Sequence, residues 1–552
     1  MFSFIVRKLR FAKIKKKSEK AENRPEDETY EYEGKEGKKF TDNLDKNIEM
    51  LKNIITESSD LIFRRFVFGE DKNAVIVYID GLIDKTLVHE NILKPLMGAE
   101  SFKDGELPEK IDIEYVKSKL LFVGSIDEKE SVDDIVSKIL AGDTVFLMDG
   151  AQKALAVSLR GWERRGIEEP QTESVVRGPR EGFTETLRIN TSMLRRKIKN
   201  PNLKFETLTI GERTKTDVCI AYINGLAKPE LIDEIKARLS KIKTDAILES
   251  GYIEQYIEDA PFSIFSTVAN SEKPDKVAAK LLEGRAAIFV DGTPFVLTVP
   301  MVFIDSFQAA EDYYSRPFFA STIRLLRFIA FFISILAPAL YVAMSTFHQE
   351  LIPTPLLLSM AAAHEGVPFP AALEAAIMIA VFEILREAGV RLPRPIGQAV
   401  SIVGALVIGE AAVSAGLIGA PMVIVVAITA VSSFAVPSQT DSAAIIRFCL
   451  LILAGVMGGY GIAIGLLAML VHLSTMHSFG IPYLMPLAPF NRSGMKDTFI
   501  RAPIWAMKKR PLGIAIDEDR QSGAMNKWTE ESEKRPEADT GGGDFGDGEK
   551  TV

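Results

Sequence analysis

Apolar residues are unevenly distributed along the chain and divide it into two parts. Up to about residue 320, short apolar runs rich in β-branched residues alternate with amphipathic stretches, which is typical of α/β proteins. From Leu325 onward the apolar runs are much longer, and a helix needs about 20 apolar residues to cross a bilayer. The pattern predicts a multi-domain chain, with an α/β region followed by an α-helical transmembrane bundle.

The α/β region contains an internal repeat. Residues 73–96 and 217–240 share an apolar run, the sequence Tyr-Ile-(Asp/Asn)-Gly-Leu and an amphipathic helical stretch. Residues 142–157 and 284–299 form a second pair at nearly the same offset, each with Asp-Gly between apolar runs. Asp-Gly in that setting is a strong hairpin signal. Two related α/β subdomains explain both pairs.

Asp80, Asp149 and Asp291 each precede a glycine in these repeated patterns. Turn chemistry is the simplest explanation, because glycine supplies the positive φ that a tight turn requires. A metal-binding or catalytic role is the alternative for these carboxylates.

Shifts in composition set the expected domain boundaries. Both ends of the chain are highly charged and are expected to be disordered. The basic start of the chain is either a solvated tail or a surface anchor for anionic lipid. The expected segments are a disordered N-terminal segment (1–44), a first α/β subdomain (45–167), an Arg/Glu-rich linker and helix (168–200), a second α/β subdomain (201–320), a transmembrane helical domain (321–490) and a cytosolic tail, basic then acidic (491–552).

Five apolar runs are candidate membrane spans, at residues 325–347, 370–388, 396–417, 420–436 and 445–473. The flanking Lys and Arg residues fall on one side of the predicted bundle, which makes that side cytoplasmic and places the α/β region there.

Five crossings would leave the basic C-terminal segment outside the cell. We therefore expect an even number of crossings, about four to six, with residues 351–370 or 478–490 as a re-entrant segment.

Glu374, Glu383 and Glu410 lie within the apolar runs, where an ionised side chain costs at least about 3 kcal/mol. Glu383 can pair with Arg386 on one helix face, so a structural ion pair is one interpretation. Glu410 has no local partner and is the better candidate for a water-filled path. Because rings of carboxylates attract cations, the three are candidates for an ion path.

The last apolar run contains two small-xxx-small pairs, Gly455 with Gly459 and Gly461 with Gly465. Such pairs allow close helix contact, either within the bundle or between subunits.

Between the two subdomains, Arg177, Arg180 and Glu181 belong to a segment dense in Arg, Glu and Gly. That segment is either a solvated linker or an interface where Arg recognises carboxylates.

Composition excludes several classes of function. The net charge of −8 gives no indication of a nucleic-acid partner. The two cysteines, Cys219 and Cys449, form neither a disulfide framework nor a zinc motif. There is no P-loop, GxSxG, HExxH or CxxC motif, and the histidines do not cluster. We expect no enzymatic activity, no cofactor and no metal.

Several segments carry a family resemblance: VRGPREGFTE at 176–185, AHEGVPFP at 363–370, the YIDGL and YINGL strands, and the long run EILREAGVRLPRPIGQAVSIVGALVIGEAAVSAGL at 383–417. Together they resemble the A-subunit family of spore germinant receptors, the GerA family, over about residues 45–510. The related stage V sporulation AF subgroup shares this architecture, so both subgroups stay open. His364 departs from the pattern, since many relatives are expected to have Arg there.

The resemblance implies a multi-pass subunit of a nutrient-responsive germinant receptor in the inner membrane of bacterial spores, with both termini cytoplasmic. It implies a transporter-like B subunit that binds nutrient and a lipoprotein C subunit as partners. It also implies homo-oligomers that form a ligand-gated cation path and trigger germination. A non-conducting scaffold of the same complex is the main alternative. A secondary transporter component is another, but inverted repeats are not visible in the membrane half.

Overall fold

The computed structural model describes residues 38–55, 58–68, 72–98, 112–161, 170, 173, 175–391, 407–517 and 519–520. The basic N-terminal segment, the acidic tail beyond residue 520 and the first half of the run at 396–417 lie outside the described residues.

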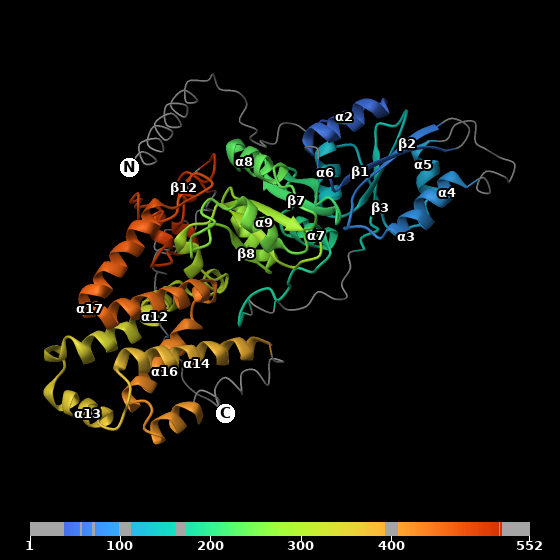
Figure 1. Ribbon diagram of the computed structural model, residues 1–552. Helices are drawn as coiled ribbons and strands as arrows, with labels where there is room; N and C mark the ends of the chain where they lie inside the picture. The colour runs from blue at the N-terminus through green and yellow to red at the C-terminus, as the bar shows by residue number, and fades with distance from the viewer. Residues whose placement is uncertain are drawn as a thin grey trace, which may run out of the picture.

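The α/β region consists of two antiparallel five-stranded sheets with the same strand order (Figure 1). The order is β1-β2-β4-β5-β3 in the first sheet and β6-β7-β9-β10-β8 in the second. The first sheet contains β1 Leu61–Phe68, β2 Lys72–Ile79, β3 Ile126–Lys129, β4 Thr144–Met148 and β5 Ala154–Val157. The second contains β6 Leu203–Ile210, β7 Thr216–Ile223, β8 Ala269–Ser271, β9 Ala286–Val290 and β10 Val296–Val299. The repeated sequence pattern thus corresponds to two sheets of one topology.

Helices cover both faces of each sheet, which explains why the central strands are continuous apolar runs. In β7, Val218 and Ile220 pack under one helix pair, whereas Cys219 and Ala221 pack under the other. The helices of the first unit are α2 Leu44–Ile54, α3 Lys85–Val88, α4 Lys94–Met97, α5 Ile113–Tyr115 and α6 Val132–Leu140. Those of the second are α7 Leu187–Lys197, α8 Pro229–Ser240, α9 Ser250–Ile257 and α10 Pro274–Leu282.

A further repeated motif precedes each sheet, FTDNLDKN at 40–47 and FTETLRIN at 183–190. In each copy the Asn side chain accepts a hydrogen bond from the Thr amide and donates one to the Thr carbonyl, Asn47 with Thr41 and Asn190 with Thr184. Helix α7 is therefore the first helix of the second unit. The expected segment 168–200 had instead grouped this helix with the linker. Likewise, residues 38–44 were expected to be disordered, but they pack on the first unit.

The Asp-Gly turns hold the N-termini of these two helices. Asp149 Oδ1 accepts a hydrogen bond from Leu44 N at 3.2 Å, and Asp291 Oδ1 accepts one from Leu187 N at 2.9 Å. The following glycines have φ of +81° and +92°. Turn chemistry therefore accounts for both carboxylates.

Replacing Asp291 with Ala should destabilise α7 by about 1 kcal/mol, the usual cost of a lost helix cap. Asp149→Ala should cost less, because Asn43 also caps α2, whereas Thr186 makes no cap bond at α7. Hydrogen exchange of the α7 and α2 amides in the full chain measures both effects. Asp233→Ala, at an exposed position on α8, is the control. Equal loss of protection in α2 and α7 would contradict the assignment.

The C-terminal half is a helical region built around α12 Pro317–Thr346, which runs through Pro338 as one helix. It packs against α14 Ala371–Arg391, α16 Ala420–Ser433 and α17 Thr440–Thr475, and the short helix α13 Thr354–His364 packs on α16. Helix α12 and the segment Pro437–Thr475 are long and apolar enough to cross a membrane. Only 44% and 33% of their most apolar 18-residue stretches are buried, whereas the core helix of a soluble protein is mostly buried.

Helix α17 bends sharply at Gly458, where φ is +58° and ψ is −140°. The second arm packs back on the first, since a Cβ on Gly465 would lie 2.5 Å from Leu450 Cδ2. Both ends of α17 lie beside one loop of the second α/β unit: Ser442 bonds to the Ile264 carbonyl and His472 to Ser263. The run at 445–473 is thus a helical hairpin and not a single span, and its two arms meet near the label α17 in Figure 1.

The chain after α17 returns to the second α/β unit. Ser478 Oγ donates a hydrogen bond to the Thr267 carbonyl at 2.7 Å, and Phe303 N donates one to the Tyr483 carbonyl at 2.8 Å. Residues 478–490 were one of two candidates for a re-entrant segment, but they pack here, outside the helical hairpin. The bend at Gly458 returns the chain instead.

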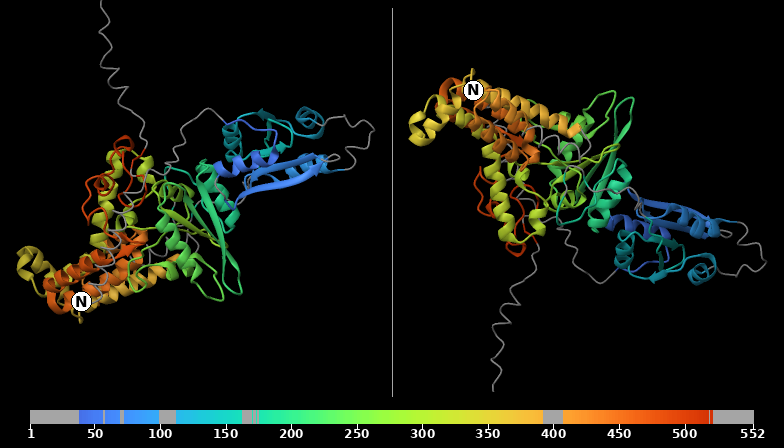
Figure 2. Two further views of the ribbon diagram at one scale, coloured as in Figure 1. Left: turned by 90° about the horizontal axis from the view of Figure 1, so that it is seen from above. Right: turned by 90° about the horizontal axis from the view of Figure 1, so that it is seen from below.

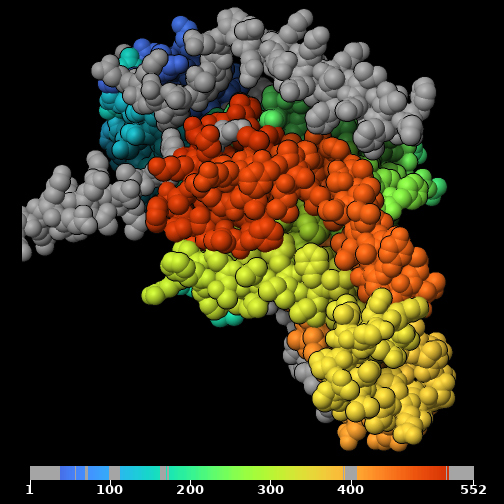
Figure 3. Space-filling view, turned by 90° about the vertical axis from the view of Figure 1, so that its left-hand side faces the viewer, coloured from blue at the N-terminus to red at the C-terminus, as the bar shows by residue number. Residues whose placement is uncertain are grey.

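Residues 491–517 were expected to be a disordered tail, which is wrong. Arg501, Ile514 and Ala515 are buried, and Ala515 pairs with Ala227 of the second unit. In Figure 3 this red segment and α17 lie directly against the yellow-green part of the chain that contains the start of α12. Figure 2 shows the first α/β unit, the second unit and the helical region following one another along the molecule.

Candidate functional site

Glu374 is buried in the first turn of α14 and joins four elements of the helical region. Its Oε1 lies 3.1 Å from His364 Nδ1, and its Oε2 accepts a hydrogen bond from Gly419 N at 3.1 Å. The other ring nitrogen of His364 is 2.9 Å from the Tyr341 hydroxyl. Because Tyr341 belongs to α12, His364 to α13 and Gly419 precedes α16, this carboxylate fastens the end of the bundle that is far from the α/β units.

Glu383 lies two to three turns further along α14 and is held by two arginines. Its carboxylate is 2.9 Å from Arg386 Nη2 and 2.8 Å from Arg447 Nη1. Arg447 is completely buried and also donates to the Ser334 carbonyl on α12. The Glu383–Arg386 pairing expected from the sequence is present, but Arg447 of α17 is a second partner that local spacing could not reveal.

Glu410 differs from the other two carboxylates because it lies on the surface. It forms no hydrogen bond or ion pair with any residue that the structure describes. Val407, Ile408 and Leu417 around it are also exposed. Among the described residues, therefore, Glu374, Glu383 and Glu410 share no partner within one chain.

The candidate glycines pack within the chain at the bend of α17. A Cβ on Gly455 would lie 3.0 Å from Ala372 Cβ, and Gly459 N donates to His348 Nε2 at 3.1 Å. Gly461 and Gly465 contact Leu453 and Leu450 of the opposite arm. Their role between subunits stays a prediction.

The residues proposed for an interface lie before α7. Arg177 and Arg180 are exposed, and Glu181 lies 3.3 Å from Lys197 and 3.7 Å from Arg196. Both arginines are therefore accessible to a partner on the part of the surface that the structure describes. The interface therefore also stays a prediction.

A buried charge network that the sequence did not suggest lies where α12 leaves the α/β region. Asp312 accepts hydrogen bonds from Arg324 and Arg327, and Arg324 also reaches Asp497 at 2.7 Å. Asp497 belongs to the C-terminal segment, residues 491–517. The network therefore joins α12, the turn that precedes α12 and this segment. In the sequence, the only sign of this network is the pair Arg324 and Arg327 at the start of an apolar run.

A second buried cluster lies beside it. Asp305 contacts both Arg285, at 2.5 Å and 3.0 Å, and Lys280, at 2.8 Å. Burial alone would raise the pKa of the Asp305 carboxyl, but these two cations hold that pKa well below its usual range. Asp305 is therefore ionised at neutral pH.

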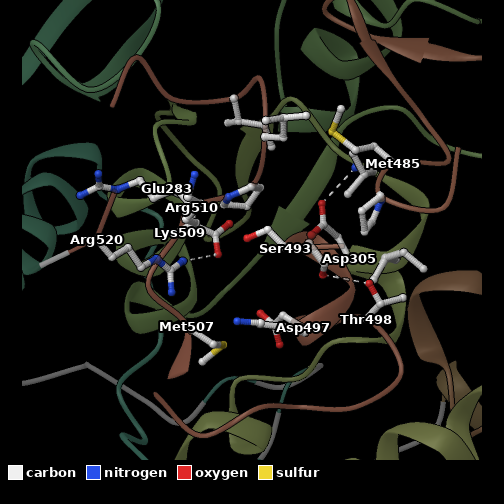
Figure 4. A pocket seen from close by; sticks show the side chains of 18 of the residues that line it. Glu283, Asp305, Met485, Ser493, Asp497, Thr498, Met507, Lys509, Arg510 and Arg520 are labelled. Carbon is white, nitrogen blue, oxygen red and sulfur yellow. Dashed lines mark hydrogen bonds and ion pairs between the residues drawn. The ribbon is translucent and has the colours of Figure 1, made fainter. Parts of the chain in front are cut away.

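A cavity of about 510 Å³ opens between this cluster and the C-terminal segment. In the view of Figure 4, Lys509, Arg510 and Arg520 lie on one side of it, and Asp305, Thr498 and Met485 on the other. Its basic lining residues are Arg285, Arg492, Lys496, Lys508, Lys509, Arg510 and Arg520. Its acidic lining residues are Glu283, Asp305 and Asp497. Within the described part of the chain, no group of three His, Cys, Asp or Glu side chains could hold a metal ion.

Known proteins similar to this chain are spore germination proteins and a membrane protein. Over 87% of the chain and 88% of the relative, it is 49% identical to "Spore germination protein KA" of Bacillus subtilis. It is 46% identical to "Uncharacterized membrane protein YfkQ" of the same organism, over 91% of this chain and 97% of that one. "Spore germination protein GerLA" of Bacillus cereus is 39% identical over 85% of this chain and 95% of its own length.

A solved structure also matches, the N-terminal domain of the A subunit of the Bacillus megaterium spore germinant receptor GerK3. It is 36% identical, covers 49% of this chain and 99% of its own, and has a TM-score of 0.39. The family described as Bacillus/Clostridium GerA spore germination protein matches residues 49–512. With most of its length matched by one family and near-full-length relatives in it, this chain belongs to the GerA family of spore germination proteins.

Proposed function

We propose that this chain is the membrane-embedded A subunit of a nutrient-responsive spore germinant receptor. Copies of it assemble around a gated cation path that Glu410 lines. The observation that carries the proposal is that Glu410 is exposed among exposed apolar side chains and pairs with none of the residues that the structure describes. In lipid such a carboxylate is costly, so it faces water or a neighbouring subunit.

The surface of the helical region supports insertion into a bilayer. Large apolar side chains on α12, α16 and α17 face outward, and soluble monomers rarely expose so large an apolar area. Examples are Leu325, Ile329, Ile424, Ile428, Ile452 and Leu467. Each arm of α17 is roughly 26 Å long at 1.5 Å per residue, close to the roughly 30 Å of a hydrocarbon core.

The bend of α17 also supports a topology with both termini in the cytoplasm. The structure describes α12, α14, α16 and the two arms of α17. If the apolar run at 396–417 also crosses, as the sequence predicts, there are six crossings. The far end of the bundle then holds Gly458, His348 and Glu374, on the side away from the α/β units. An even number of crossings removes the conflict with the basic C-terminal segment.

The proposed partners are those that the resemblance to the family implies. The subunit works with a transporter-like B subunit that binds nutrient and with a lipoprotein C subunit, in the spore inner membrane. It acts without catalysis: nutrient binding at the B subunit shifts the assembly toward an open path. The near-full-length similarity to spore germination proteins supports this role.

Flux through reconstituted protein tests the proposal. Proteoliposomes that are loaded with K⁺ and hold the chain with its B and C subunits should release K⁺ when nutrient is added. Glu410→Gln should lower the rate about tenfold, because neutralising a ring of carboxylates removes the attraction for cations. Glu230→Gln, at an exposed position on α8, is the matched control and should leave the flux unchanged. Unchanged flux and unchanged K⁺/Cl⁻ selectivity in Glu410→Gln would overturn the assignment.

One observation favours a non-conducting scaffold instead. Glu374 and Glu383 are held in contacts with His364, Arg386 and Arg447, so two of the three nominated carboxylates do not line water within one chain. If the wild-type oligomer passes no ions, alone or with its B and C subunits, the scaffold role remains and conduction fails.

A further inference from the structure

The cavity at the junction between the second α/β unit and the C-terminal segment has an unbalanced charge. Its three acidic residues are each neutralised: Glu283 by Arg285 and Arg520, Asp305 by Arg285, and Asp497 by Arg324. Four of its cations remain, and their side chains form no hydrogen bond or ion pair with the described residues. These are Arg492, Lys496, Lys508 and Lys509.

The cavity lies level with the cytoplasmic end of the first membrane helix. The C-terminal segment is hydrogen-bonded to the second turn of α12, where Arg501 N donates to Ser321 Oγ at 3.0 Å. Between this contact and the lysines, Ile504 and Trp505 are 61% and 50% exposed. An exposed Trp beside lysines is typical of the membrane–water interface. The segment therefore presents an apolar edge and a basic edge at the height of the lipid headgroups.

The lining matches a particular ligand chemistry. The four free cations provide donors for a phosphate, whereas Met485, Met507 and Leu512 provide apolar contacts beside them. A volume of about 510 Å³ holds a headgroup together with the first carbons of its chains. A purely polar anion would leave the apolar part of the lining unmatched.

We propose that this cavity binds the phosphate headgroup of an anionic phospholipid from the cytoplasmic leaflet. Lys496, Lys508, Lys509 and Arg492 contact the phosphate, and Trp505 lies in the interface beside it. The bound lipid contacts the C-terminal segment, which is also joined to α12 by the buried Arg324–Asp497 contact. The lipid and this contact together hold the segment against α12. The inference rests on the membrane placement proposed above, but not on conduction.

Native mass spectrometry of the full chain tests the site. Protein taken from nanodiscs of phosphatidylglycerol and phosphatidylcholine should retain phosphatidylglycerol. A Lys496→Gln/Lys508→Gln/Lys509→Gln variant should retain about tenfold less of it, since each Lys near a headgroup contributes to binding. The control Lys215→Gln/Lys241→Gln/Lys243→Gln removes three exposed lysines of the second α/β unit and should behave as wild type.

A second arm separates lipid from a soluble anion. Inorganic phosphate is titrated against the detergent-solubilised chain, and its thermal midpoint is followed. Stabilisation by phosphate at millimolar concentration, with no preference for phosphatidylglycerol, would overturn the lipid source. Equal retention by both triple variants would overturn the site. If wild-type protein does not enter nanodiscs of either lipid, the membrane placement itself fails, which distinguishes that outcome from loss of the site.

Discussion

Gly458→Val should disrupt the hairpin of α17 and lower the stability of the helical region by roughly 3–5 kcal/mol. The backbone there, with φ +58° and ψ −140°, lies in a region that is nearly restricted to glycine, so a β-branched residue is strained. A Cβ at this position would also lie 2.8 Å from Cβ and Cγ of Phe347, which is below any normal contact. Neither cost can be relieved without opening the bend.

Opening the bend changes which side of the membrane the C-terminus reaches. In inside-out vesicles, an epitope after residue 552 should be accessible to protease in the wild type. In Gly458→Val it should become partly protected, and the thermal midpoint in detergent should fall. Gly366→Val is the control, because a Cβ on Gly366 meets no atom within 4 Å. A Gly458→Val protein with the wild-type midpoint and an accessible C-terminus would show that no hairpin turns at this residue.

The pattern of apolar residues predicted the α/β region and its repeat because both depend on local periodicity. The strand pairs and Asp-Gly turns are encoded within a few residues, and the turns lie where the dipeptides predicted them. The repeat of Phe-Thr-x-x-Leu-x-x-Asn at 40–47 and 183–190 was also visible in the sequence. This repeat assigns α7 to the second unit, but it precedes the segments 73–96 and 217–240 on which the two-subdomain prediction was based.

The bend of α17 could not be predicted in the same way. Five glycines lie within a few turns of one another, and nothing in their spacing distinguishes Gly458 from Gly455 or Gly461. Which one takes a positive φ depends on Phe347 and His348, which directly follow α12 and are far away in the sequence. The apolar run was therefore interpreted as one long span.

The partners of the carboxylates could not be predicted from the neighbouring sequence either. Arg447 meets Glu383 from 64 residues away, and Asp497 meets Arg324 from 173 residues away. The C-terminal segment resembled a flexible tail because it is rich in Lys and Arg, but several of its residues pack inward. Charge density alone does not separate a solvated tail from a segment that folds onto a charged junction.

Among substitutions of the three candidate carboxylates, Glu383→Leu should lower the stability of the helical region most, by about 3–5 kcal/mol. It leaves Arg447 buried with only the Ser334 carbonyl as acceptor, and close to the like charge of Arg386. Arg447→Met should cost less, because Glu383 keeps Arg386. The double variant Glu383→Leu/Arg447→Met should recover most of the loss, since replacing both members of a buried pair with apolar residues removes the cost of desolvating charge.

Thermal unfolding of each variant in nanodiscs of one lipid composition measures these differences as a double-mutant cycle. Glu387→Leu and Arg391→Met remove an exposed pair on the same helix and serve as controls with little expected effect. If Glu383→Leu is no worse than these controls, then Glu383 and Arg447 are not a dry pair in the assembled protein. Water would then reach this level of the bundle, and Glu383 would join Glu410 as a residue of the ion path.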